Sequence, residues 1–152
     1  MPGRIFSINI GNIKGVSKAP VNEGKLIEGF GLEGDVHAGT EFKQVSLLSI
    51  ESIRKQKECE RIKSKDIALK EGDFAENITT QGLDLSGLRI GSLIKAGGES
   101  LLKITKIGKD CHTYCQNYKK TGDCIMPKEG IFASVIKGGI IHKGDSIQVL
   151  DD

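Results

Sequence analysis

Short runs of alternating apolar and polar residues follow one another along most of the chain. Residues 3–10 predict a first strand, because isoleucines recur there among polar positions. Residues 11–24 carry many turn-forming residues and predict an exposed loop. A second strand is expected over residues 25–30 and a short buried strand over residues 44–48, with a glycine-rich segment between them.

The pattern changes at Ser49, where it predicts the one long helix of the chain. Ser49 is a favourable N-cap residue, and Glu51 in the first turn suits the positive end of the helix dipole. Ile50, Ile53 and Cys59 form only a thin apolar stripe, so the helix is expected on the surface of the fold. We interpret Cys59 as a half-buried small apolar residue of this helix.

Strand-like runs and turns alternate from residue 73 to the end of the chain, at a spacing of roughly ten residues. The 20 glycines against only 3 prolines also indicate many tight turns between short strands. A barrel would leave none of these strands with a free edge. The sequence therefore predicts a mainly β fold in a single domain over residues 1–152. The expected architecture is a closed or partly closed antiparallel barrel with one longer and one or two short helices.

Composition argues against several classes of function. The net charge is only +2, aromatic residues make up 5% and tryptophan is missing, so nothing favours nucleic-acid binding. The sequence has neither an apolar run of about 18 residues nor the apolar core of a signal peptide, so no membrane contact is expected. We therefore expect a cytoplasmic protein whose four cysteines are reduced thiols.

Three of these cysteines cluster between positions 111 and 124, in the segments KDCHTYC and TGDCIM. A thiolate is both a nucleophile and a soft-metal ligand, and the lysines nearby favour the thiolate form. Three thiols and one imidazole (Cys111, His112, Cys115 and Cys124) could bind zinc, although their spacing is not that of a standard zinc ribbon. Alternatively, one cysteine carries a persulfide that a neighbouring thiol resolves, or all three are ordinary buried thiols.

Two further motifs, GDVHAG and ENITT, place polar side chains together. Asp35 could orient the ring of His37, as carboxylates do beside metal sites, or it could cap a turn that leaves His37 exposed. Glu76, Asn77 and Thr79 stand at a strand end and could offer donors and acceptors to a polar ligand. The residues alone favour the simpler alternative, an asparagine-mediated turn beside ordinary strand threonines.

Five segments of the chain, in order, resemble the MOSC family, which is named after the C-terminal domain of molybdenum cofactor sulfurases. They are GLEGDVHAG, QVSLLSIESI, GDFAENITTQGLDLSGLRIGSLIKAG, ITKIGKDCHTYC and GDCIMPKEGIFASVIKGGIIHKGD. The resemblance covers nearly the whole chain and is nearest to the short stand-alone bacterial form. It implies a β-barrel related to the pyruvate-kinase barrel domain, and a role in molybdenum-cofactor or metal–sulfur metabolism.

The resemblance also implies roles for individual residues. Cys124 matches the position of a metal-binding or sulfur-carrying thiol and Cys111 the other cysteine position of the family, whereas Cys115 departs from the simplest pattern. The GDVHAG and ENIT motifs match sequences that line the family's cleft. The candidate catalytic residues are Cys124 and Cys111, with Cys124 also the candidate metal ligand. The candidate cofactor-binding residues are Asp35, His37, Glu76, Asn77, Thr79, His112 and Cys115.

These observations predict a binding and carrier domain for a molybdopterin-type ligand. The metal or its dithiolene sulfur would lie near Cys124, or a persulfide on Cys124 would be passed to the metal centre with His112 as general acid. The expected partners are a PLP-dependent cysteine desulfurase or molybdenum cofactor synthesis enzymes. PLP itself is not expected on this chain, nor is independent desulfurase or reductase activity. The alternative is a zinc-stabilised structural or interaction domain built on the Cys111–Cys124 cluster.

Overall fold

The described part of the computed structural model covers residues 3–11, 18–36, 38–40, 44–57, 76–83, 85, 88–107 and 130–150. Within these ranges the chain forms strands β1 to β11 and one helix, α1. Their bounds are β1 Gly3–Ile10, β2 Ala19–Val21, β3 Glu23–Ile27, β4 Gly31–Leu32, β5 Val45–Ser49, α1 Ile50–Lys57, β6 Ile78–Gln81, β7 Leu93–Ala96, β8 Ser100–Ile107, β9 Ile131–Lys137, β10 Gly139–His142 and β11 Ser146–Leu150.

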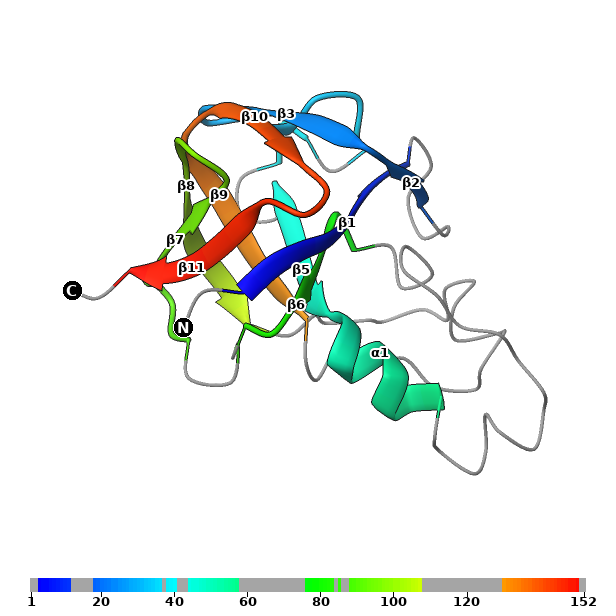
Figure 1. The fold of residues 1–152 in the computed structure, drawn as a ribbon. Coiled ribbons are helices and arrows are strands. Elements are labelled where there is room, and N and C mark those ends of the chain that lie inside the picture. The colour runs from blue at the N-terminus through cyan, green and yellow to red at the C-terminus, as the bar shows by residue number, and fades with distance from the viewer. Residues whose placement is uncertain are drawn as a thin grey trace.

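Seven of the strands close into a barrel, in the order β11-β7-β8-β9-β5-β6-β1 (Figure 1). The first and last strands of this order pair with each other, with Gly3 opposite Ile147 and Arg4 opposite Ser146. Strand β2 pairs with the far end of β1, where Ile10 lies opposite Ala19. The predicted mainly β barrel is therefore confirmed, and its closure gives each of the seven strands a partner on both sides.

The barrel interior is filled by apolar side chains at alternate positions of its strands. Ile94 and Ala96 of β7 and Leu102 and Ile104 of β8 are fully buried, and Ile94 pairs directly with Leu102. Ile147 of β11 is also fully buried. Burying one such large side chain contributes about 1.5–3 kcal/mol, so the alternating pattern of these strands decides which face of each strand points inward.

One strand pair of the barrel is parallel. Leu47 of β5 lies opposite Ile78 of β6, and the two strands run in the same direction. The expectation of an antiparallel barrel is wrong at this pair. A parallel pair needs a long crossover connection, and the chain from Ile50 to Asn77 provides it. The first four residues of β5 are all buried, as expected of a strand covered on both faces.

A second sheet of three strands, in the order β10-β3-β4, lies over one end of the barrel (Figure 1). Its residues Leu26, Leu32 and Ile141 belong to the same apolar core as the barrel strands. Gly24 of β3 leaves room for this packing, because a Cβ at this position would lie 2.7 Å from Cδ1 of Leu32 and would force the leucine side chain to shift. The prediction of an exposed loop over residues 11–24 is wrong for its second half, where Lys18 is buried and β2 and the start of β3 are formed.

Helix α1 begins where the sequence predicts, and it follows β5 directly. The backbone N–H of Ser52 donates to Oγ of Ser49 at 3.0 Å, which is the expected N-cap bond. Ile50 and Ile53 are buried, which confirms the start of the apolar stripe. The predicted continuation to Cys59 and the further short helices lie outside the described residues. In the described ranges, no helix has the length and apolar character needed to cross a membrane.

The N-cap of α1 gives a direct test of this part of the fold. Replacing Ser49 by alanine removes the acceptor for the Ser52 N–H, and the free energy of unfolding should fall by about 0.5–2 kcal/mol. Ser49→Asp keeps an acceptor at the same position and should remain close to wild type. Urea unfolding monitored by circular dichroism measures both variants. Equal stabilities of Ser49→Ala and wild type would show that the cap does not stabilise the helix.

Candidate functional site

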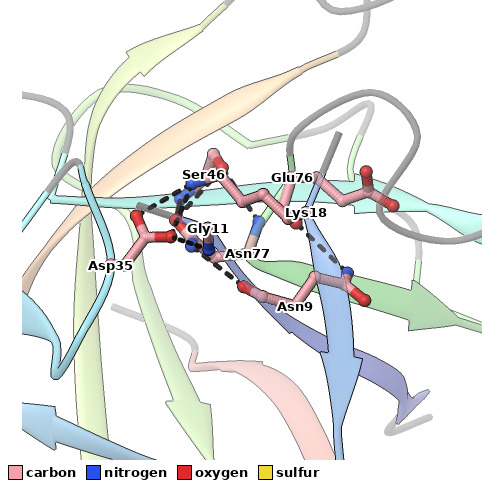
Figure 2. A network of polar contacts seen from close by, with 7 residues as sticks. All are labelled: Asn9, Gly11, Lys18, Asp35, Ser46, Glu76 and Asn77. Atoms are coloured by element: carbon pink, nitrogen blue, oxygen red, sulfur yellow. Dashed lines mark hydrogen bonds and ion pairs between the residues drawn. The ribbon is translucent and has the colours of Figure 1, made fainter. Parts of the chain in front are cut away.

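Asn77 immediately precedes β6 and is bonded to the strands on both sides of it (Figure 2). Its backbone N–H donates to the carbonyl of Ser46 at 3.0 Å, and its own carbonyl accepts from the N–H of Asn9 at 2.7 Å. Its side chain repeats the pattern. Oδ1 accepts from the Ser46 N–H at 3.0 Å, and Nδ2 donates to the Asn9 carbonyl at 3.2 Å. Asn77 therefore fastens β5 to β1 with both its main chain and its side chain.

A second set of buried polar side chains surrounds Asn9. Nδ2 of Asn9 donates to the carbonyl of Glu76 at 3.1 Å and to Oγ1 of Thr79 at 3.0 Å, while Oδ1 accepts from Oγ of Ser7 at 2.8 Å. The Thr79 hydroxyl donates to Oε2 of Glu76 at 2.6 Å. All four residues are buried. Because a buried polar group must be hydrogen-bonded, these contacts stabilise one arrangement of the strand ends.

The third component is a buried ion pair. Nζ of Lys18 lies 2.8 Å from both carboxylate oxygens of Asp35, and neither side chain is exposed to solvent. Oδ1 of Asp35 also accepts from the backbone N–H of Gly11 at 3.0 Å, and the Gly11 carbonyl accepts from the N–H of Val36 at 2.7 Å. These contacts join the end of β1, the residue before β2 and the turn after β4.

Four of the predicted cofactor-binding residues gather around the end of β1. Asp35 contacts Gly11, and Asn77 contacts Asn9 (Figure 2). Thr79 also contacts Asn9. Glu76 receives the hydroxyl of Thr79 and lies in the same network. The remaining predicted site residues lie outside the described part of the chain: His37, Cys111, His112, Cys115 and Cys124.

The four described candidates do not fit a direct contact with a cofactor or metal. Asp35 is 7% exposed and the other three are fully buried, and their side chains bond to protein groups. Within the described ranges, no group of three His, Cys, Asp or Glu side chains is placed to hold a metal ion. The network of Asn9, Ser46, Asn77 and their partners is therefore a scaffold of buried hydrogen bonds.

Several residues of this scaffold were not anticipated from the sequence. Lys18 follows a turn-rich segment, in which a lysine is normally exposed, so its burial beside Asp35 has no local signal. Ser7 and Asn9 do have one, because they occupy alternate positions of a strand that contributes Ile5 to the core. Polar residues on the buried face of a strand need polar partners, so this pattern could have indicated a buried network.

Comparison with known proteins places the chain in a family. A family model described as MOSC domain matches residues 33–148. The YuaD protein from Bacillus subtilis has a similar structure, with a TM-score of 0.75 and 19% identity over 97% of this chain and 94% of that chain. YiiM from Geobacillus stearothermophilus gives a TM-score of 0.73 and 20% identity over 99% of this chain and 76% of that chain. No curated protein matches the chain in sequence.

A further similar structure is YiiM from Escherichia coli, with a TM-score of 0.72 and 19% identity over 100% of this chain and 71% of that chain. At this identity the solved structures establish the fold, a closed β-barrel with a small second sheet. The family model matches well over half of the sequence, and the chain belongs to the MOSC domain family. This family is associated with molybdenum cofactor sulfurase-type function.

The contacts of Asn77 predict a large effect of its removal on stability. Asn77→Ala leaves the N–H of Ser46 and the carbonyl of Asn9 without their side-chain partner, and each such buried group costs about 1–3 kcal/mol. Asn22→Ala makes the same substitution at an exposed position and should change stability by no more than about 0.5 kcal/mol. The midpoints of urea unfolding compare the stabilities of the two variants, provided that the slope of the free energy against urea concentration is unchanged. If both variants unfold at the same midpoint, Asn77 does not stabilise the barrel end.

Proposed function

We propose that this protein binds the molybdenum cofactor or carries sulfur destined for it, with Cys124 as the acting thiol. The observation that carries the proposal is the extent of the family match. It includes Asp35, Asn77 and the whole segment from Cys111 to Cys124. The association of the MOSC family with molybdenum cofactor sulfurases supplies the class of chemistry.

The residue types between positions 111 and 124 suit this chemistry. A thiolate is the reactive form of cysteine in sulfur transfer and in binding soft metals, and neighbouring lysines favour its ionisation. Cys124 is the proposed sulfur carrier or metal ligand, Cys111 the second acting thiol and Cys115 a resolving thiol. His112, next to Cys111 in the sequence, is the proposed general acid.

The buried scaffold supports the proposal because it fixes the residues that directly precede a candidate site residue in the sequence. Asp35 and Val36 are fixed against Gly11, and they directly precede His37 in the sequence. A functional group acts more effectively when the shell that surrounds it is rigid and fully hydrogen-bonded. In this proposal Asp35, Glu76, Asn77 and Thr79 position the site and do not themselves bind the ligand.

The proposal extends to the setting in which the protein works. We propose a single domain over residues 1–152 that acts in the cytoplasm, where its thiols remain reduced. A PLP-dependent cysteine desulfurase or a molybdenum cofactor synthesis enzyme is the proposed partner. Neither nucleic acid nor membrane is proposed as a partner.

The set of donors in the cysteine segment favours one alternative. Three thiols and one imidazole match the ligand chemistry of a structural zinc site, in which metal binding supplies folding free energy. The protein would then be a zinc-stabilised structural or interaction domain. The same preparation distinguishes the two functions, because their metals and their sensitivity to chelators differ.

Protein purified without oxygen from cells supplied with molybdate tests both functions. Elemental analysis measures molybdenum and zinc, and mass spectrometry of the intact protein detects an added sulfur atom on cysteine. Wild type is expected to retain molybdenum cofactor or a persulfide, and Cys124→Ser should reduce both to background. Cys59→Ser removes the cysteine outside the cluster and should retain the wild-type content.

Two outcomes would contradict the proposal. Wild type that carries neither molybdenum nor persulfide would exclude the carrier function, and so would a Cys124→Ser variant that loses nothing. Stoichiometric zinc, together with unfolding when a chelator removes it, would establish the structural alternative instead.

A further inference from the structure

Lys18 is a buried cation in a part of the chain where the sequence predicts an exposed loop. Its ammonium is completely enclosed and contacts both oxygens of Asp35, seventeen positions further along the chain. A buried ion pair of this kind adds little stability relative to an apolar pair of similar volume, because both charges lose their hydration. The pair does fix the position of the two side chains relative to each other, because displacing one charge would separate it from the other inside the protein.

The β1–β2 connection and the turn after β4 meet at the Asp35 carboxylate. The N–H of Gly11 donates to this carboxylate at 3.0 Å, and the Gly11 carbonyl accepts from the N–H of Val36 at 2.7 Å, so one bond to a side chain and one to the main chain join residue 11 to the turn. Lys18 adds the third bond from the other end of the connection, one residue before β2. Asp35 thus ties both ends of the β1–β2 connection to the turn after β4.

The ion pair is also coupled to the network around Asn77. Asn9 lies two residues before Gly11 on the same strand, and its carbonyl accepts the side-chain N–H of Asn77 at 3.2 Å. The end of β1 is therefore bonded to the start of β6 at Asn9 and to the Asp35 turn at Gly11. A shift of the turn would have to move Gly11 against a strand end that Asn77 holds in place.

We propose that Lys18 and Asp35 are positioning residues of the proposed cofactor-handling site. Their ion pair sets the place of Asp35 and Val36, which directly precede His37 in the sequence, relative to the barrel, without contact between either side chain and the ligand. This inference rests on the proposed function and adds Lys18, together with a specific role for Asp35, to the site.

The main test replaces Lys18 by methionine, which keeps an unbranched side chain one atom shorter and removes the charge. The probe is molybdenum cofactor released without oxygen from a molybdoenzyme, and molybdenum retained per protein after gel filtration gives its affinity. Loss of a residue that positions a site typically weakens binding about 10- to 100-fold, and we expect this for Lys18→Met and for Asp35→Asn. Lys25→Met makes the same change at an exposed position of β3 and should bind as wild type does.

A second variant separates positioning from general stability. In Lys18→Met/Asp35→Leu the buried pair becomes apolar, so the midpoint of urea unfolding should return toward the wild-type value. The Gly11 N–H still lacks its acceptor, so cofactor affinity should stay about 10- to 100-fold below wild type. Affinity that recovers together with stability would show that the pair acts only through folding, and would overturn the inference.

Amide hydrogen exchange in the protein without ligand tests the positioning directly. In the double variant, exchange of the Gly11 and Val36 amides should rise about tenfold or more, while amides of β7 and β8 remain at wild-type rates. Unchanged exchange at Gly11 and Val36 would overturn the inference even if the cofactor binds. If wild type itself retains no cofactor, the positioning role fails, and the proposed function fails with it only if wild type also carries no persulfide. If wild type binds and the folded variants bind equally well, only the positioning role fails.

Discussion

The bonds of Asn77 to Ser46 and Asn9 hold three neighbouring strands, β5, β6 and β1, together at one end of the barrel. At this end of the barrel a parallel pair, β5 and β6, meets an antiparallel one, β6 and β1, and the main-chain groups at the strand ends need partners inside the protein. Asn77 provides them with its main chain and with its side-chain amide, on both sides at once. Aspartate could accept but not donate here, and an apolar residue could do neither.

The other polar residues extend this junction into a continuous buried unit. Asn9 connects the junction to Thr79 and Glu76, and Gly11 connects it to the Lys18–Asp35 pair. A buried hydrogen-bonded network of this kind favours a single arrangement, because each displaced group would lose a partner where water cannot replace it. The two motifs that carry the family resemblance in this region thus contribute to a rigid base. In our proposal the cysteine segment supplies the chemistry.

The sequence predicts the features that depend on local patterns. The strand over residues 3–10, the buried strand at 44–48 and the helix cap at Ser49 follow from apolar spacing and N-cap preference, and the structure confirms each of them. The parallel pairing of β5 with β6 is not local, because it depends on where a long crossover returns. The partners of Lys18 and Asn9 lie 17 and 70 positions away, so no local pattern could identify them. The family resemblance indicated Asp35 and Asn77 as candidate ligand-binding residues, but it did not indicate their buried contacts with other residues of the protein.

Native-state hydrogen exchange of the Ser46 amide measures how firmly the network around Asn77 holds this end of the barrel. The N–H of Ser46 donates to a buried side-chain oxygen, Oδ1 of Asn77, and the N–H of Arg89 donates to an exposed one, Oγ of Ser92, both at 3.0 Å. If the network around Asn77 is the rigid base of the barrel end, the Ser46 amide exchanges only through global unfolding while the Arg89 amide exchanges through local fluctuations. Exchange of the Ser46 amide as fast as that of Arg89 would contradict the account.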